Sequence, residues 1–163
     1  MGFRMGEAGA AIAGFLGAAA VGSATLAAAE DAYAPLKYYA GHWTVTTCRG
    51  KAVELVNNCA RTGLFFVCEH SIDGAPKALV VFLPQGGGGH YRTQTLGADG
   101  AEPGHWFSLR IEDSDWVYTP EAAEPRERTL NHFIDADHIH FDVQKKDGGA
   151  WKTTLSGDET RVK

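Results

Sequence analysis

Two histidines near the C-terminus have the spacing that comes closest to a metal site in this chain. In His138-x-His140, on a segment with strand-like alternation, both imidazoles point the same way and can share one divalent ion, with Asp142 two residues further on. The apolar residues that alternate with them are the natural inward-facing set, which turns both histidines toward solvent. A closed zinc site also needs a third and a fourth ligand, and the spacing identifies none. We therefore predict no metal and no other cofactor, with His138 and His140 as the nearest candidates.

Three other motifs are weaker candidates for a binding or catalytic site. Gly86–Gly89 has the composition of a phosphate-binding loop but lacks its Lys-Ser/Thr ending and leads into a strand. The carboxylate clusters Glu112–Asp115 and Asp135–Asp137 lack the ligand spacing of a calcium loop. Glu69 and His70 are neighbours on a strand, so their side chains face opposite ways and cannot form an acid–base pair with each other. No catalytic residue is identified, and the prediction leans away from an enzyme.

The sequence also supplies residues that can bind an apolar molecule, because aromatic side chains recur along most of the predicted strands. The candidates to line a pocket are Trp43, Phe66, Phe107, Trp116, Tyr118, Asn131, Phe141 and Trp151. A tightly packed core needs the same residue types. The sequence therefore leaves open whether the interior is hollow or filled.

These residues lie on short β-type segments separated by turns rich in Gly and Asp. The predicted strands are 42–48, 64–72, 77–83, 91–96, 106–111, 116–119, 128–134, 138–144 and 151–155, with a last piece at 160–162. Residues 49–63 are interpreted as the loop after the first strand, and residues 31–40 can hold a helical turn. Short strands with short connections favour an antiparallel sheet that closes on itself. We predict an all-β fold, an antiparallel up-and-down barrel of about 8–10 strands with a short N-terminal helical turn.

The Gly-x-Trp sequence of Gly41-His42-Trp43, on the first predicted strand, resembles the start of a lipocalin or broader calycin barrel. In that family the Trp plugs the closed end of the barrel and a late Arg packs across its ring. The resemblance therefore implies structural roles for Gly41, Trp43 and Arg161, with a cation–π contact between the last two. The order of segments is also similar to that of small exported bacterial calycin-like proteins of uncharacterised function. This similarity implies a barrel and brings no activity with it, because one scaffold hosts unrelated functions.

The N-terminus has the pattern of an export signal. Arg4 precedes an Ala/Gly-rich apolar stretch over 8–26, and three small residues, Ala27 to Ala29, precede Glu30. We predict a signal peptide over residues 1–29, a calycin-like barrel domain over 30–163, and a periplasmic or secreted location without stable membrane insertion after cleavage.

The formal net charge of −5 and the scattered basic residues argue against binding to nucleic acid.

Three cysteines, Cys48, Cys59 and Cys68, follow the predicted signal. An exported chain meets an oxidising compartment, where a pair can form a disulfide and leave one cysteine over. A 48–59 bond would close the loop after the first strand, and a 59–68 bond would staple the following hairpin. Both pairings are compatible with the sequence.

Three hypotheses about function follow. The first is an exported protein that binds a small hydrophobic or amphipathic ligand inside its barrel. The alternative is a non-catalytic structural or accessory envelope protein with a filled barrel. An enzyme, or a heme or metal binder, ranks below both. An enzyme would require at least two titratable groups to converge in the barrel cavity.

Overall fold

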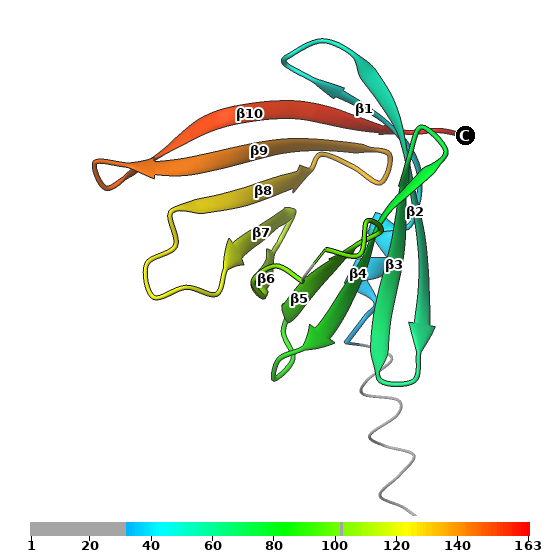
Figure 1. The fold of residues 1–163 in the computed structure, drawn as a ribbon, viewed down its shortest axis with the longest axis horizontal. Helices are drawn as coiled ribbons and strands as arrows, with labels where there is room; N and C mark the ends of the chain where they lie inside the picture. The colour runs from blue at the N-terminus through cyan, green and yellow to red at the C-terminus, as the bar shows by residue number, and fades with distance from the viewer. Residues whose placement is uncertain (1–31, 102) are drawn as a thin grey trace, which may run out of the picture.

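Ten antiparallel strands make up most of the described chain, residues 32–101 and 103–163 of the computed structural model (Figure 1). They are β1 (Gly41–Thr47), β2 (Ala52–Thr62), β3 (Phe65–Ile72), β4 (Ala75–Pro84), β5 (His90–Gly97), β6 (Phe107–Glu112), β7 (Asp115–Pro120), β8 (Glu127–Phe133), β9 (His138–Asp147) and β10 (Ala150–Arg161). Each strand pairs with the next along the chain, and β10 pairs with β1, which closes the sheet. The prediction of an all-β, antiparallel up-and-down barrel is confirmed. The predicted signal peptide lies outside the described residues.

The predicted helical turn is a single 3-10 turn, η1 (Pro35–Tyr39). Tyr33 and Leu36 are buried together with aromatic residues of the strands. The Tyr33 hydroxyl donates to the carbonyl oxygen of Leu64 at 2.6 Å, and the Tyr91 hydroxyl donates to the carbonyl oxygen of Ala32. The segment before β1 therefore packs inside the barrel and fills part of it. In the part of the chain that the structure describes, no helix is long and apolar enough to cross a membrane.

Strand β2 occupies residues that the sequence analysis assigned to a loop, and this prediction was wrong. Its inward positions alternate as Val53, Leu55 and Asn57, so a polar residue stands where an apolar one is expected. Asn57 is only 2% exposed, and its side-chain amide donates to the carbonyl oxygen of Tyr39 at 3.2 Å. The inward-facing amide interrupts the hydrophobic alternation, which is why the strand resembled a turn.

Strand β10 unites two predicted segments, 151–155 and 160–162, across residues that have the composition of a turn. Gly157 is buried in the middle of this strand. A Cβ at this position would lie 2.5 Å from the carbonyl oxygen of Thr46 and 2.7 Å from the ring of Phe141. The glycine therefore allows close packing inside a continuous strand and does not end it.

One end of the barrel is closed by Trp43 and Arg161, which are direct partners in the β1–β10 ladder. Trp43 is fully buried, and the guanidinium carbon of Arg161 lies 4.0 Å from its ring centroid. The same guanidinium donates to the carbonyl oxygens of Tyr38 and Ala40, each at 2.8 Å. Gly41 has a φ of +139°, and a Cβ there would overlap Arg161. The contact between Arg161 and Trp43 expected from the sequence is present.

A disulfide joins Cys59 and Cys68, which face each other in the β2–β3 ladder. Cys48 is exposed and free. The 59–68 pairing is therefore the correct alternative, and the 48–59 pairing is wrong. Because β1 and β2 run antiparallel, β2 carries Cys59 toward the end of β1 opposite to Cys48.

Candidate functional site

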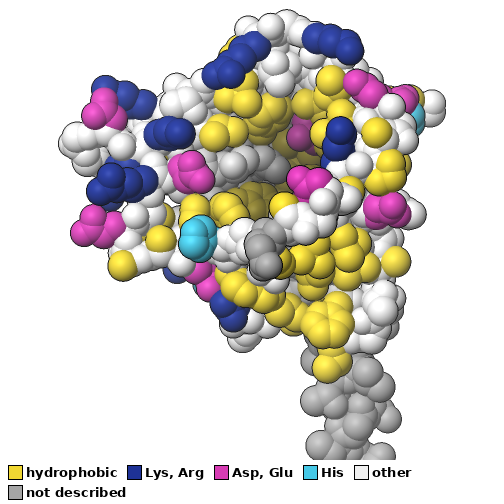
Figure 2. Space-filling model, in the orientation of Figure 1, with side chains coloured by type: hydrophobic (Ala, Val, Ile, Leu, Met, Phe, Trp, Pro, Cys, Tyr) yellow, Lys and Arg dark blue, Asp and Glu magenta, His cyan; other side chains and the backbone are white. Residues whose placement is uncertain are grey.

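A cavity of about 330 Å³ lies inside the barrel, lined by η1 and by every strand from β3 to β10. This volume is at the lower end of the range of small-molecule sites. Ile139 packs with Trp43 at the closed end, whereas Phe141 and Val143, further along β9, line the cavity. The cavity therefore extends away from the closed end. Figure 2 shows a hollow on this face of the molecule, with hydrophobic side chains around it and an acidic group inside it.

The walls of the cavity are mainly apolar. Their apolar side chains are Val80, Phe82, Phe107, Phe141 and Val143. Three threonines stand between them, Thr93, Thr95 and Thr129, of which Thr95 is exposed and Thr93 is buried. These walls arise from the two-residue alternation of the strands, because every second side chain points inward.

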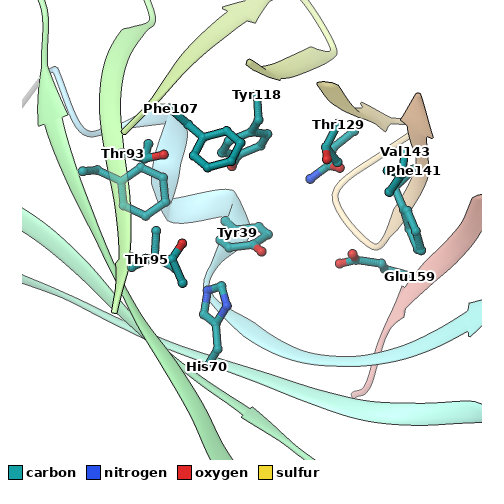
Figure 3. A pocket seen from close by; sticks show the side chains of 13 residues that line it. Tyr39, His70, Thr93, Thr95, Phe107, Tyr118, Thr129, Phe141, Val143 and Glu159 are labelled. Atoms are coloured by element: carbon teal, nitrogen blue, oxygen red, sulfur yellow. The ribbon is translucent and has the colours of Figure 1, made fainter. Parts of the chain in front are cut away.

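Polar groups gather in one region of the cavity. Tyr39, His70 and Glu159 point toward a shared space (Figure 3), and Tyr118 and Asn131 also line the cavity. The rings of Tyr39 and His70 meet edge to face, with their centroids 5.7 Å apart. This region lies next to the closed end, because Tyr39 and Glu159 are each two residues from members of the Gly41–Arg161 contact.

Three buried polar atoms in this region have no hydrogen-bond partner. They are the carboxylate Oε2 of Glu159, the Nε2 of His70 and the amide Oδ1 of Asn57. Asn57 and His70 are direct partners in the β2–β3 ladder, so their side chains lie next to each other. Leaving a buried polar group unpaired costs about 1–3 kcal/mol, so such groups are expected to meet a polar partner.

Burial changes the acidity of these groups. Desolvation raises the pKa of Glu159 from 4.5 to about 7 and lowers the pKa of His70 from 6.5 to about 4. It also raises the pKa of Tyr39 and of Tyr118, and the negative charge of Glu159 adds to both increases. Around neutral pH the cavity therefore contains a neutral imidazole and a carboxyl group near its titration midpoint. Perturbed titratable groups in a pocket are typical of functional sites.

The predicted pocket residues divide into three groups. Four of them line the cavity: Phe107, Tyr118, Asn131 and Phe141. Three pack in the hydrophobic core outside the cavity: Trp43, Phe66 and Trp116. Trp151 is on the outer surface, where the guanidinium carbon of Arg128 lies 4.6 Å from its ring centroid.

Sequence reasoning missed the most polar residues of the site, although strand alternation could have located them. Arg161 was expected to face Trp43 inside the barrel, and Glu159 is two residues earlier on the same strand. In the same way, Phe66 and Cys68 are buried, and His70 continues their inward-facing series on β3. His70 and Glu159 meet in one cavity only because the barrel closes, and a local sequence pattern cannot predict this.

The weak metal candidates are outside the barrel. The Nδ1 of His138 lies 2.9 Å from a carboxylate oxygen of Asp135, and the Nδ1 of His140 lies 2.7 Å from one of Asp158. Within residues 32–101 and 103–163, no three His, Cys, Asp or Glu side chains are grouped as a metal site requires.

Comparison with known proteins finds similar structures but no matching sequence. The chain matches no protein-family model, and no curated protein matches its sequence. Among solved structures, it is similar to the crystal structure of Rv2717c from M. tuberculosis, with a TM-score of 0.46 and 14% sequence identity. The alignment covers 81% of this chain and 98% of that chain.

Proposed function

We propose that this protein binds one small amphipathic molecule inside its barrel. The observation that carries the proposal is the cavity of about 330 Å³, whose apolar walls enclose buried polar atoms without protein partners. Apolar walls with a few placed polar groups are the usual composition of a small-molecule site. This composition favours a ligand binder over an accessory protein with a filled barrel.

The ligand would insert its apolar part between Phe107 and Phe141 and direct its polar end toward Glu159 and His70. Burial of the apolar part contributes about 25 cal/mol per Å². The polar end would supply the hydrogen bonds that the unpaired atoms lack. The two ends together would hold the ligand in one orientation.

We also propose that the barrel is calycin-like and that the protein works outside the cytoplasm. The first proposal is supported by Gly41 and Trp43 on the first strand and by the packing of Arg161 on Trp43. The second is supported by the signal-like pattern of residues 1–29 and by the Cys59–Cys68 disulfide, which is compatible with an oxidising compartment.

A fluorescent titration tests the binding proposal. N-phenyl-1-naphthylamine, a small aromatic probe, is added to the purified barrel and to two variants. Thr129→Phe adds a ring to the cavity wall, and Thr44→Phe adds the same ring on the exposed face of β1. We expect the wild type and Thr44→Phe to bind the probe alike and Thr129→Phe to bind it at least about tenfold more weakly. Equal binding by all three proteins would contradict the proposal.

A second candidate function is acid–base catalysis on a bound molecule. It is favoured by the convergence of His70 and Glu159 in one cavity and by the pKa of Glu159, about 7, which suits a proton donor or acceptor near neutral pH. Mass spectrometry of a ligand recovered after incubation would test it. Catalysis predicts a product with the wild type that Glu159→Gln does not form, and an unchanged ligand with both proteins would exclude turnover of that ligand.

A further inference from the structure

The charge of the cavity lining restricts which ligands it can accept. Among the described residues that line the cavity, none is Lys or Arg. His70 is neutral around neutral pH, because burial lowers its pKa to about 4. Glu159 is therefore the group that brings charge to the lining, and this charge is negative. An anionic ligand would meet no opposite charge and would be repelled by the carboxylate.

The hydrogen-bonding capacity of the site points in the same direction. A carboxylate oxygen and an amide oxygen only accept hydrogen bonds, and the unpaired atoms include one of each, on Glu159 and Asn57. Both side chains are more than nine-tenths buried, with 8% and 2% of their surface exposed. Of the two residues, Glu159 lines the cavity, so a ligand that pairs with its carboxylate must bring N–H or O–H donors.

Aromatic rings surround the same space. Tyr39, Tyr118 and Phe107 line the cavity with Phe141, and Figure 3 shows the Tyr39 ring close to the space toward which Glu159 points. The faces of aromatic rings attract cations electrostatically. A carboxylate among aromatic rings is a suitable environment for an organic ammonium group, which must be well paired to leave water.

We propose that the bound molecule is a small organic cation, an ammonium group on an apolar body, whose N–H groups donate to the carboxylate of Glu159. This inference rests on the proposed binding function and specifies its ligand class. The apolar body lies along Phe107 and Phe141.

Binding of this kind is coupled to the ionisation of Glu159. The titratable side chains that share the cavity with it are Tyr39 from η1, His70 from β3 and Tyr118 from β7. On the ladders beside it, Glu159 faces the uncharged Val45 and Ile139. Both tyrosines and His70 stay neutral between pH 5 and pH 8. The preference for a cation therefore follows the carboxylate alone and strengthens as pH rises through about 7.

Three compounds with one apolar body test this inference: 4-phenylbutylamine, 4-phenylbutanol and 4-phenylbutanoate. Their affinities are measured by isothermal titration calorimetry at pH 8 and pH 5. The variants are Glu159→Gln and, as a matched control, Asp158→Asn, which removes the same charge from the neighbouring exposed position of β10. At pH 8 we expect the amine to bind the wild type and Asp158→Asn at least about tenfold more tightly than the alcohol, and the carboxylate to bind most weakly.

The preference for the amine over the alcohol should be lost only when the Glu159 carboxylate is removed or protonated. In Glu159→Gln, and in the wild type at pH 5, amine and alcohol should bind within about threefold of each other. An alcohol or carboxylate that binds the wild type at pH 8 as tightly as the amine would overturn the cation inference and leave the binding function intact. The cation inference would also be overturned, with the binding function intact, if Glu159→Gln still preferred the amine or if Asp158→Asn lost that preference. Binding of none of the three compounds would overturn both proposals.

Discussion

Glu159 is a carboxylate in a buried position, where its charge is unfavourable. A carboxylate loses favourable hydration on burial, and neither a Lys nor an Arg lines the described cavity to compensate it. The result is a pKa raised to about 7 and an oxygen without a partner. A buried and unpaired carboxyl group lowers the stability of the fold. Such groups are therefore expected at sites where they bind a ligand.

The pH dependence of stability tests this interpretation. The folded protein holds the Glu159 proton more tightly than the unfolded chain, so this group lowers the free energy of unfolding as pH rises from about 4.5 to about 7. His70 acts in the opposite direction between about 4 and 6.5, because its folded pKa is lowered. Glu159→Gln should therefore be more stable than the wild type at pH 8, by up to about 3 kcal/mol, and similar to it at pH 4.

Urea unfolding of both proteins from pH 4 to pH 8 measures this difference. Glu127→Gln, at an exposed position of β8, is the control and should follow the wild type. Glu159→Gln should gain stability from pH 4 to pH 6.5, where His70 acts alone, and then stay level. Parallel curves for Glu159→Gln and the wild type would show that the carboxyl group is not buried.

A second prediction at the residue scale concerns the closed end. Trp43→Ala removes a fully buried ring and the contact with Arg161, and should lower the free energy of unfolding by about 3–5 kcal/mol. Trp151→Ala removes a surface ring that also contacts an arginine and should cost about 1 kcal/mol. Chemical denaturation compares the two, and an equal effect would contradict the assignment of Trp43 to the barrel plug.

At the scale of elements, most strands were predictable from the sequence, whereas β2 was missed and β10 was divided. Strand β9 was located from its alternation, because Ile139 and its inward neighbours are all apolar. Strand β2 was missed because Asn57 interrupts the pattern, and β10 was divided because Gly157 resembles a turn. Asn57 and Gly157 both lie near the candidate site. At such positions a function can require residue types that are unusual in a hydrophobic core.

The β2–β3 hairpin provides a test at this scale. Replacing Cys59 and Cys68 together by Ala opens a short covalent loop and should lower the free energy of unfolding by about 2–3 kcal/mol. Cys48→Ala, at an exposed position, should change it by less than about 0.5 kcal/mol. Thermal unfolding and a thiol assay check both statements. More than one reactive thiol per native chain would contradict the assigned disulfide.

At the scale of the whole molecule, closure of the barrel produces the site. It brings η1, β3 and β10, which are far apart in sequence, around one cavity, and it places Tyr39, His70 and Glu159 together. Four of the eight predicted pocket residues line this cavity, since inward direction can be deduced from alternation. The division between filled core and hollow cavity could not be deduced, because it depends on how far η1 enters the barrel.

Native mass spectrometry of the protein isolated from the cells that make it shows whether the barrel carries a ligand. We expect the wild type to carry an excess mass that is released on denaturation and belongs to a small amphipathic molecule. Thr129→Phe, isolated in parallel, should carry little of it. The bare polypeptide mass for both proteins would contradict the claim that the barrel is a binding site.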